Sequence, residues 1–182
     1  NFNTTAMDNY GTIAGGTFDA YVNLFDGSNV TGGTFNLGNP IIQPGVTITQ
    51  GQFDVGIDNW GTIEGGTFTG SLANIFEYGT ISGGHYQDMV SNYGDINNGT
   101  FDGEVTNYGW ADGGNAVIYG GTFNNTVTNW NLIDGGTFNA YVDNEETIID
   151  GTFYGAVNNM AQIDGGTYYG LVSNDAEIYG GT

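Results

Sequence analysis

The feature that most constrains the fold is a repeat that runs through the whole chain. The motif G-G-T-F, or a close variant of it, occurs eleven times, and its third position falls at Thr17, Thr34, Gln52, Thr67, His85, Thr100, Thr122, Thr137, Thr152, Thr167 and Thr182. Successive copies are 17, 18, 15, 18, 15, 22, 15, 15, 15 and 15 residues apart, so the unit is fifteen residues long and the longer steps contain insertions. A short period of this kind predicts a solenoid, in which each unit packs only against its neighbours.

Aligned on this motif, the repeat reads I-x-G-G-T-F-x-G-x-V-x-N-Y-G-T. An aliphatic residue fills the first position in every copy: Ile13, Val30, Ile48, Ile63, Ile81, Ile96, Ile118, Ile133, Ile148, Ile163 and Ile178. The Phe, Val and Asn positions are separated by even numbers of residues, as expected for a strand with one buried face. We therefore expect a short strand around the Ile and one longer strand from the Phe through the Val to the Asn.

The second glycine of the motif is Gly in all eleven copies, from Gly16 to Gly181. A position that accepts no Cβ in any copy indicates a positive φ at a corner or a close approach of backbone. Each repeat then forms one coil, with a Gly-Gly corner between its strands and a second corner at Y-G-T. The predicted fold is all-β: a single-stranded β-solenoid (a β-helix or β-roll) of about eleven fifteen-residue coils, forming one domain over residues 1–182.

An asparagine closes the longer strand in most copies. Asn9 begins this column, which continues with Asn59, Asn74, Asn92, Asn107, Asn129, Asn144, Asn159 and Asn174. Coils stacked about 4.8 Å apart allow such amides to hydrogen-bond to one another along the axis, which satisfies polar groups at a corner. We expect these residues to form a structural Asn ladder.

The composition excludes several classes of function. The 182 residues include no Lys, Arg or Cys, a single His and 20 acidic residues, which give a net charge of −20. Nucleic-acid binding depends on cationic side chains, so no nucleic-acid partner is expected. No apolar run approaches the roughly 20 residues of a membrane-spanning helix, so we expect no membrane insertion. The 14% of aromatic residues argues against disorder.

Residues 63–68 (I-E-G-G-T-F) and 133–138 (I-D-G-G-T-F) carry a family resemblance. They resemble the G-G-T-F solenoid repeats of large secreted and surface-anchored bacterial proteins, and the resemblance covers essentially the whole chain. It implies an extracellular or cell-surface location and a structural role, and it transfers no catalytic residue. The coil length is also similar to that of small β-solenoid antifreeze proteins.

The two ends of the chain read as complementary parts of one coil. The C-terminus stops just before an aromatic residue is due, and the N-terminus supplies an aromatic residue followed by residues of the Val and Asn columns. Unpaired strand edges at the ends of a solenoid invite further strands. We therefore expect protomers to stack head to tail into an extracellular filament. The assembly-end residues are Asn1, Phe2, Met7, Ile178, Tyr179 and Thr182. The alternative is a stalk or adhesin segment cut from a longer surface protein.

The insertions fall between the Val column and the next Ile, which predicts loops along one edge of the rod. They carry apolar residues, among them Phe25, Ile41, Ile42, Phe76 and Trp110. These side chains either pack locally over the sheet edge or make lateral contacts with another molecule, such as a second filament.

Ice or a polysaccharide is the alternative ligand. Nine of the eleven motif positions are Thr, which suits ice binding, but only Thr67 and Thr69 form a Thr-x-Thr pair. Aromatic residues after the Asn column could stack on sugar rings or simply pack at the corner: Tyr10, Trp60, Tyr93, Tyr108 and Trp130.

Catalysis and cofactors are not expected. Among twenty carboxylates, pairs such as Glu145 and Glu146 arise by chance, and His85 has neither a second His nor a Cys beside which to act. Because the chain has no Lys or Arg, only ions from solution can reduce the repulsion between its acidic groups. Calcium is one such ion, since it accepts carboxylate and carbonyl oxygen ligands. We expect only weak calcium binding, confined to the loops, because the acids do not keep to one column.

Overall fold

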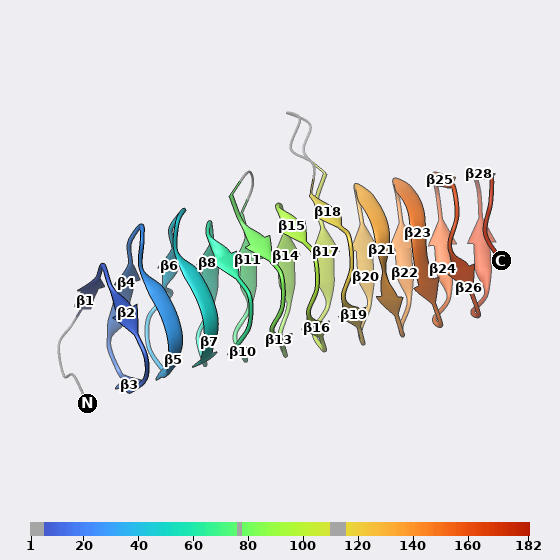
Figure 1. Ribbon diagram of the computed structural model, residues 1–182. Helices are drawn as coiled ribbons and strands as arrows, with labels where there is room; N and C mark the ends of the chain where they lie inside the picture. The colour runs from blue at the N-terminus through green and yellow to red at the C-terminus, as the bar shows by residue number, and fades with distance from the viewer. Residues whose placement is uncertain (1–5, 76–77, 110–115) are drawn as a thin grey trace.

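The computed structural model describes residues 6–75, 78–109 and 116–182, which wind into a rod of stacked coils (Figure 1). These residues contain 28 β-strands and no helix, and every pair of neighbouring strands is parallel. The predicted all-β solenoid of about eleven coils is therefore confirmed.

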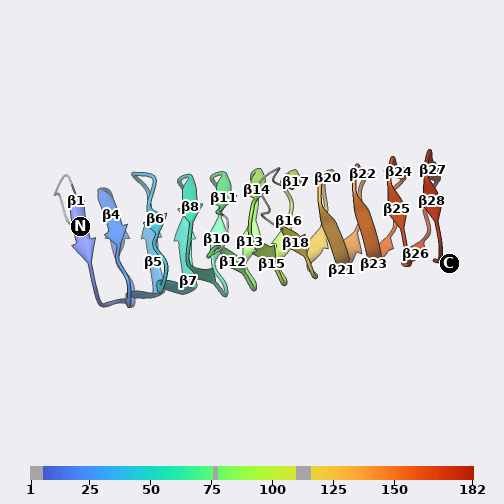
Figure 2. The same cartoon turned by 90° about the horizontal axis from the view of Figure 1, so that it is seen from above.

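One face of the rod is a sheet of eleven parallel strands, one from each coil (Figure 2). All of these strands except β6 carry the Val position, and most of them also carry the Asn position. They are β1 (Ala6–Asn9), β4 (Tyr21–Leu24), β6 (Ile41–Ile42), β8 (Ile57–Asn59), β11 (Leu72–Asn74), β14 (Val90–Asn92), β17 (Val105–Asn107), β20 (Val127–Asn129), β22 (Val142–Asn144), β24 (Val157–Asn159) and β27 (Val172–Asn174).

The remaining seventeen strands form a second sheet that bends at the Gly-Gly corner. Strands with the Ile position are β2 (Thr12–Ile13), β9 (Thr62–Ile63), β12 (Thr80–Ile81), β15 (Asp95–Ile96), β18 (Val117–Ile118), β25 (Gln162–Ile163) and β28 (Glu177–Ile178). Strands with the aromatic position are β3 (Thr17–Phe18), β10 (Thr67–Phe68), β13 (His85–Tyr86), β16 (Thr100–Phe101), β19 (Thr122–Phe123) and β26 (Thr167–Tyr168). Four longer strands continue through the corner and hold both positions: β5 (Asn29–Phe35), β7 (Thr47–Phe53), β21 (Leu132–Phe138) and β23 (Thr147–Phe153).

The expectation of one continuous strand from the Phe to the Asn is wrong. In each coil the aromatic and Val positions lie in different sheets, as where β10 ends at Phe68 and β11 begins at Leu72. Two side chains four residues apart can both point inward whether the chain between them is a straight strand or a bend. The hydrophobic pattern therefore does not reveal the corner. The backbone of neighbouring coils is close at this corner: a Cβ built on Gly70 would lie 2.3 Å from the carbonyl carbon of Val55 in the preceding coil.

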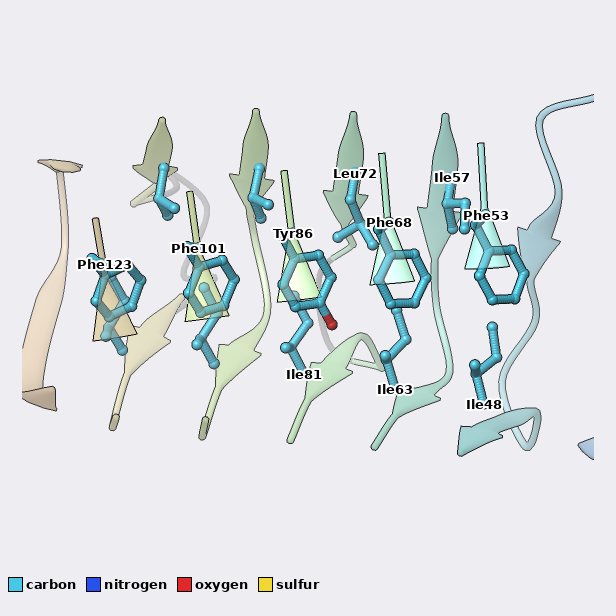
Figure 3. Close-up of a cluster of buried hydrophobic side chains, with 14 of the residues drawn as sticks. Ile48, Phe53, Ile57, Ile63, Phe68, Leu72, Ile81, Tyr86, Phe101 and Phe123 are labelled. Atoms are coloured by element: carbon cyan, nitrogen blue, oxygen red, sulfur yellow. The ribbon is translucent and has the colours of Figure 1, made fainter. Parts of the chain in front are cut away.

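The interior is one continuous core, built from parallel columns of apolar side chains (Figure 3). The Ile, aromatic and Val positions point inward and are almost fully buried from Val22 to Ile163. Nine consecutive aromatic contacts run along the axis, with ring centroids 4.5–5.0 Å apart and planes within 13° of parallel. Parallel, in-register strands impose this stacking, because each side chain meets its equivalent in the next coil.

The Gly-Gly corner explains the invariance of the second glycine. Its φ lies between +104° and +146° in all eleven coils, a region that L-residues rarely adopt. At Gly121, a Cβ would also lie 3.2 Å from both the carbonyl oxygen of Gly99 and the ring of Phe101.

We expect Gly121→Ala to lower the free energy of unfolding by about 1–3 kcal/mol, because the backbone strain adds to this crowding. Gly15→Ala is the control: Gly15 is a first glycine, its φ is not positive, and a Cβ there meets nothing within 4 Å. The control is expected to change stability by less than about 0.5 kcal/mol. Urea unfolding of both variants measures the difference, and equal losses would contradict the corner geometry.

The longer connections lie along one edge of the rod, the upper edge in Figure 1. They leave the sheet after the Asn position, so that β4 ends at Leu24 and β5 begins at Asn29, and β11 ends at Asn74 and β12 begins at Thr80. No helix in the described residues is long and apolar enough to span a bilayer.

Candidate functional site

The buried polar groups of the rod form one ladder of asparagine side chains. Seven hydrogen bonds of 2.6–2.7 Å join eight residues in sequence: Asn59, Asn74, Asn92, Asn107, Asn129, Asn144, Asn159 and Asn174. Each Nδ2 donates to the Oδ1 of the asparagine in the following coil. The ladder therefore has a direction, with donors pointing toward the C-terminal end of the rod.

The second N–H of most ladder amides donates a hydrogen bond to a backbone carbonyl oxygen at the neighbouring corner. Asn92 donates to the carbonyl oxygen of Gly94 at 2.8 Å, and Asn129 donates to that of Asn131 at 2.9 Å. Asn59 through Asn159 are completely buried, yet both their donors and their acceptors are satisfied. A buried amide with this many partners is an element of structure and has little capacity left for a ligand.

Two apolar residues, Leu24 and Ile42, occupy the ladder position in the N-terminal coils. The register pairs Asn9 with Leu24, Leu24 with Ile42, and Ile42 with Asn59. Leu24 and Ile42 are fully buried. The prediction that Ile42 makes a lateral contact is therefore wrong. Leu24 lies fifteen residues after Asn9, but an insertion displaces Ile42 from this spacing, so only the strand register identifies the column of Ile42.

The other predicted lateral-contact residues have different environments. Phe25 is half-buried and stacks on Tyr10, with centroids 4.6 Å apart, so it belongs to the corner aromatic column. Ile41 is exposed on the outer face of β6. Phe76 and Trp110 lie outside the described residues.

The corner aromatics pack on one another along the axis. Tyr93 and Tyr108 stack with centroids 4.5 Å apart and planes 5° apart, and Tyr108 meets the edge of Trp130. Tyr93 and Tyr108 each turn one face of the ring toward the other, which leaves less of these faces for a sugar. This arrangement favours corner packing over a polysaccharide-binding strip.

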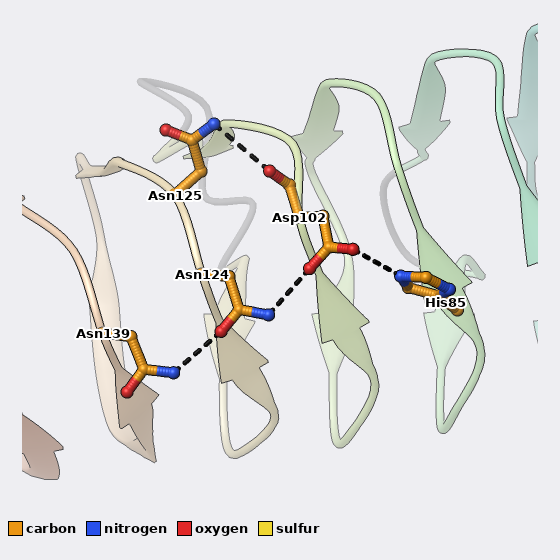
Figure 4. Close-up of polar contacts among 5 residues, drawn as sticks. All are labelled: His85, Asp102, Asn124, Asn125 and Asn139. Carbon is orange, nitrogen blue, oxygen red and sulfur yellow. Dashed lines mark hydrogen bonds and ion pairs between the residues drawn. The ribbon is translucent and has the colours of Figure 1, made fainter.

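A second row of polar side chains crosses the outer surface beside the aromatic strands (Figure 4). His85 Nε2 lies 2.6 Å from Asp102 Oδ2, and Asn124 Nδ2 donates to Asp102 Oδ1 at 2.7 Å. Asn139 continues the row by donating to Asn124 Oδ1 at 2.7 Å, while Asn125 donates to the backbone carbonyl of Asp102. The hydrogen bond from Asn124 and the contact with His85 lower the pKa of Asp102.

This lowered pKa sets the sign of a pH effect. A carboxyl whose pKa is depressed in the folded state stabilises the fold above its ordinary pKa, and that contribution disappears as the pH falls through the folded value. We expect Asp102→Asn to be less heat-stable than the wild type near neutral pH, with the difference vanishing in acid. Thermal midpoints of both proteins across the acid range measure it, and a difference that does not change with pH would contradict the assignment.

The carboxylates are dispersed along the rod, which limits their repulsion. In the described strand register, Asp8 faces Asn23 and Asp143 faces Asn158, and in both pairs the amide donates to the carboxylate. Asp134 and Asp150, at a bulged corner, are the one register pair in which two carboxylates face one another. Among the described residues, no three His, Cys, Asp or Glu side chains gather as a metal site does.

A shallow groove of about 580 Å³ lies on the outer face of the Ile strands. Burial raises the pKa of Asp95 in its wall. The groove is lined by Asp95, Val117, Tyr119, Asn131, Leu132, Glu146 and Thr147. Its walls carry the carboxylates of Asp95 and Glu146.

The predicted assembly ends lie at opposite ends of the rod. Met7 is half-buried in β1, which is one edge strand of the eleven-stranded sheet, and β27 is the other. Ile178 is 49% exposed and Tyr179 is 66% exposed on the last coil, where Thr182 is also exposed. Asn1 and Phe2 lie outside the described residues.

No protein-family model matches the sequence, and no curated protein or solved structure gives a significant match.

Proposed function

We propose that the chain is a structural, self-associating β-solenoid whose protomers stack coaxially, head to tail, to build an extracellular filament. The observation that carries the proposal is the match between the two ends of the rod. The inward columns reach both ends in one register, with Met7, Asn9 and Ile13 in the first coil and Val172, Asn174 and Ile178 in the last. A second copy stacked in this register would thus continue the Val, Asn and Ile columns across the joint.

The polarity of the Asn ladder supports head-to-tail stacking over head-to-head stacking. Asn174 accepts from Asn159 and donates one N–H to the carbonyl oxygen of Ala176, so its second N–H points beyond the last coil. At the other end, the Oδ1 of Asn9 receives only a long hydrogen bond of 3.4 Å from the Gly11 N–H. The donor at one end thus fits the acceptor at the other.

The charges on the outer surface are compatible with the same joint. In the register that aligns Asn174 with Asn9, Ser173 would face Asp8 and Glu177 would face Thr12. No carboxylate meets a carboxylate at these positions, which matters in a chain that has no Lys or Arg to neutralise one. Coaxial stacking therefore avoids the repulsion that a net charge of −20 imposes on most contacts between copies.

Electron microscopy of the purified chain at high protein concentration tests the proposal. We expect continuous filaments with an axial repeat of roughly 50 Å, the length of eleven coils at about 4.8 Å each. Ile178→Asp places a charge in the inward column at the joint and is expected to leave single rods. Leu37→Asp is the matched control, because Leu37 is an exposed aliphatic residue that does not lie at the joint, and it should still form filaments.

Isolated rods from the wild type, together with a single monomer peak in sedimentation, would overturn the filament proposal. That result would favour a stalk or adhesin segment, in which neighbouring coils come from the same chain. Both possibilities agree with membership of the G-G-T-F repeat proteins of bacterial surfaces, which we propose as the class of this chain on the strength of its repeat.

A further inference from the structure

Two exposed tyrosines stack on the outer corner of the C-terminal coils. Tyr154 follows the aromatic position of one coil and Tyr169 follows that of the next. Their ring centroids are 4.9 Å apart and their planes differ by 8°. They are 54% and 68% exposed, so solvent reaches both phenols.

The strands that precede these residues keep the two rings in register. Thr152 pairs with Thr167 and Phe153 pairs with Tyr168, so Tyr154 and Tyr169 leave equivalent points of the two coils. The Tyr169 N–H donates to the carbonyl oxygen of Phe153 at 2.8 Å, which fixes the backbone beside the second ring. Equivalent ring carbons of the two side chains are therefore held next to each other.

This combination of exposure and pairing distinguishes Tyr154 and Tyr169 from the other described tyrosines. Tyr93 and Tyr108 also stack, but both are only partly exposed. Exposed tyrosines such as Tyr21, Tyr119 and Tyr141 are followed in the next coil by Gly38 or Asn39, Asp134 and Ala156, so none stacks on a tyrosine ring. Tyr86 and Tyr168 lie in the inward column between phenylalanines.

We propose that Tyr154 and Tyr169 are a site of oxidative coupling, at which a one-electron oxidant produces a dityrosine link between two successive coils. Each phenol loses one electron and one proton, which leaves two tyrosyl radicals. The radicals join through a carbon–carbon bond between the ring carbons ortho to the two oxygens. The hydrogen on each of these carbons then moves to its phenolic oxygen. A peroxidase using hydrogen peroxide balances the reaction, because the two electrons and two protons reduce one peroxide to two water molecules.

The link would act as a covalent staple. It closes a loop of one repeat, between positions fifteen residues apart, and so restricts the unfolded chain as a disulfide does in a protein that has cysteines. The chain has no Cys, so it has no disulfide with which to do this. The staple would hold the last coils together and reduce fraying at that end of the rod.

Treatment of the dilute protein with hydrogen peroxide and a haem peroxidase tests the proposal. The product is unfolded and cut on the N-terminal side of Asp, which separates residues 150–163 from residues 164–174 because Asp150, Asp164 and Asp175 are consecutive acidic residues there. We expect mass spectrometry to find these two peptides joined with the loss of two hydrogen atoms, with fragment ions placing the bond at Tyr154 and Tyr169. We also expect dityrosine fluorescence from a band of monomer size and a raised thermal midpoint.

Tyr169→Phe keeps the ring and removes the phenol, so it should abolish the joined peptides while leaving the circular dichroism spectrum unchanged. Tyr141→Phe is the control, because Tyr141 is exposed on the same part of the rod without a stacked tyrosine, and the joined peptides should persist. Coupling mainly between separate molecules, coupling at other tyrosines, or an unchanged yield in Tyr169→Phe would overturn the proposal. These readouts come from single rods, so they are independent of whether the chain forms filaments.

Discussion

Phe123→Ala is expected to lower the free energy of unfolding by about 3–5 kcal/mol. Phe123 is completely buried and stacks between Phe101 and Phe138, with centroids 4.7 and 4.8 Å away. Backbone hydrogen bonds hold the adjoining coils at a fixed spacing, so the neighbouring rings cannot close the cavity. The loss should therefore lie toward the upper end of the range for such truncations. Urea unfolding followed by circular dichroism measures it.

Tyr86→Phe is the control for this prediction, because it keeps a ring in the same column. The Tyr86 hydroxyl donates to the carbonyl oxygen of Gly83 at 2.8 Å, and burial raises the pKa of this phenol well above its ordinary value. Removing the hydroxyl should cost about 1 kcal/mol. If Phe123→Ala cost no more than Tyr86→Phe, the aromatic column would not be the main apolar support of the rod.

Asn129→Leu is expected to destabilise the protein by about 3–5 kcal/mol, although Leu has a similar size and suits the buried site. Asn129 accepts from Asn107 and donates to both Asn144 and the carbonyl oxygen of Asn131. The substitution leaves several buried polar atoms without a partner, and each costs about 1–3 kcal/mol. Urea unfolding again gives the difference.

Leu24→Asn is the reciprocal control. Leu24 lies in the same column between Asn9 and Ile42, so a new amide there gains at most one ladder neighbour. The Leu24→Asn substitution should also destabilise the protein. That result would show that the side chains in the neighbouring coils, and not the residue type alone, decide which side chain fits the column. An Asn129→Leu variant as stable as the wild type would mean that the ladder contributes specificity of register without net stability.

Both predictions concern columns, because this architecture distributes its stability over repeated contacts. No residue of the described core belongs to a compact centre; each inward side chain meets its equivalents in two neighbouring coils and its partners across a narrow interior. The same principle explains how a chain with a net charge of −20 remains folded: amides beside Asp8, Asp102 and Asp143 donate hydrogen bonds where another carboxylate would repel.

Much of the fold could be predicted from the sequence because the same residue types recur at the same positions in eleven copies of the repeat. A single Ile or Gly would carry little information, but a complete aliphatic column indicates an inward position, and a glycine in every copy indicates a positive φ. The structure gives that glycine a φ above +100° in each coil. The Asn column likewise corresponds to a continuous ladder from Asn59 to Asn174.

The errors arose where sequence spacing and spatial register differ. Counting in fifteens assigned Ile42 to a loop, whereas strand pairing places it beside Asn59 inside the rod. The corner between the Phe and Val positions was also missed, because an even spacing turns both side chains inward along a straight strand and around a bend alike.

The sequence by itself determined the repeating coil, the inward columns and the acidic charge of the chain, because these depend on residue type and period alone. Tertiary structure decided which residues share a column across an insertion, where each coil bends, and which exposed tyrosines meet. Those relationships depend on the pairing of coils, and hydrogen bonds between backbones fix that pairing whatever the length of the loop that joins them.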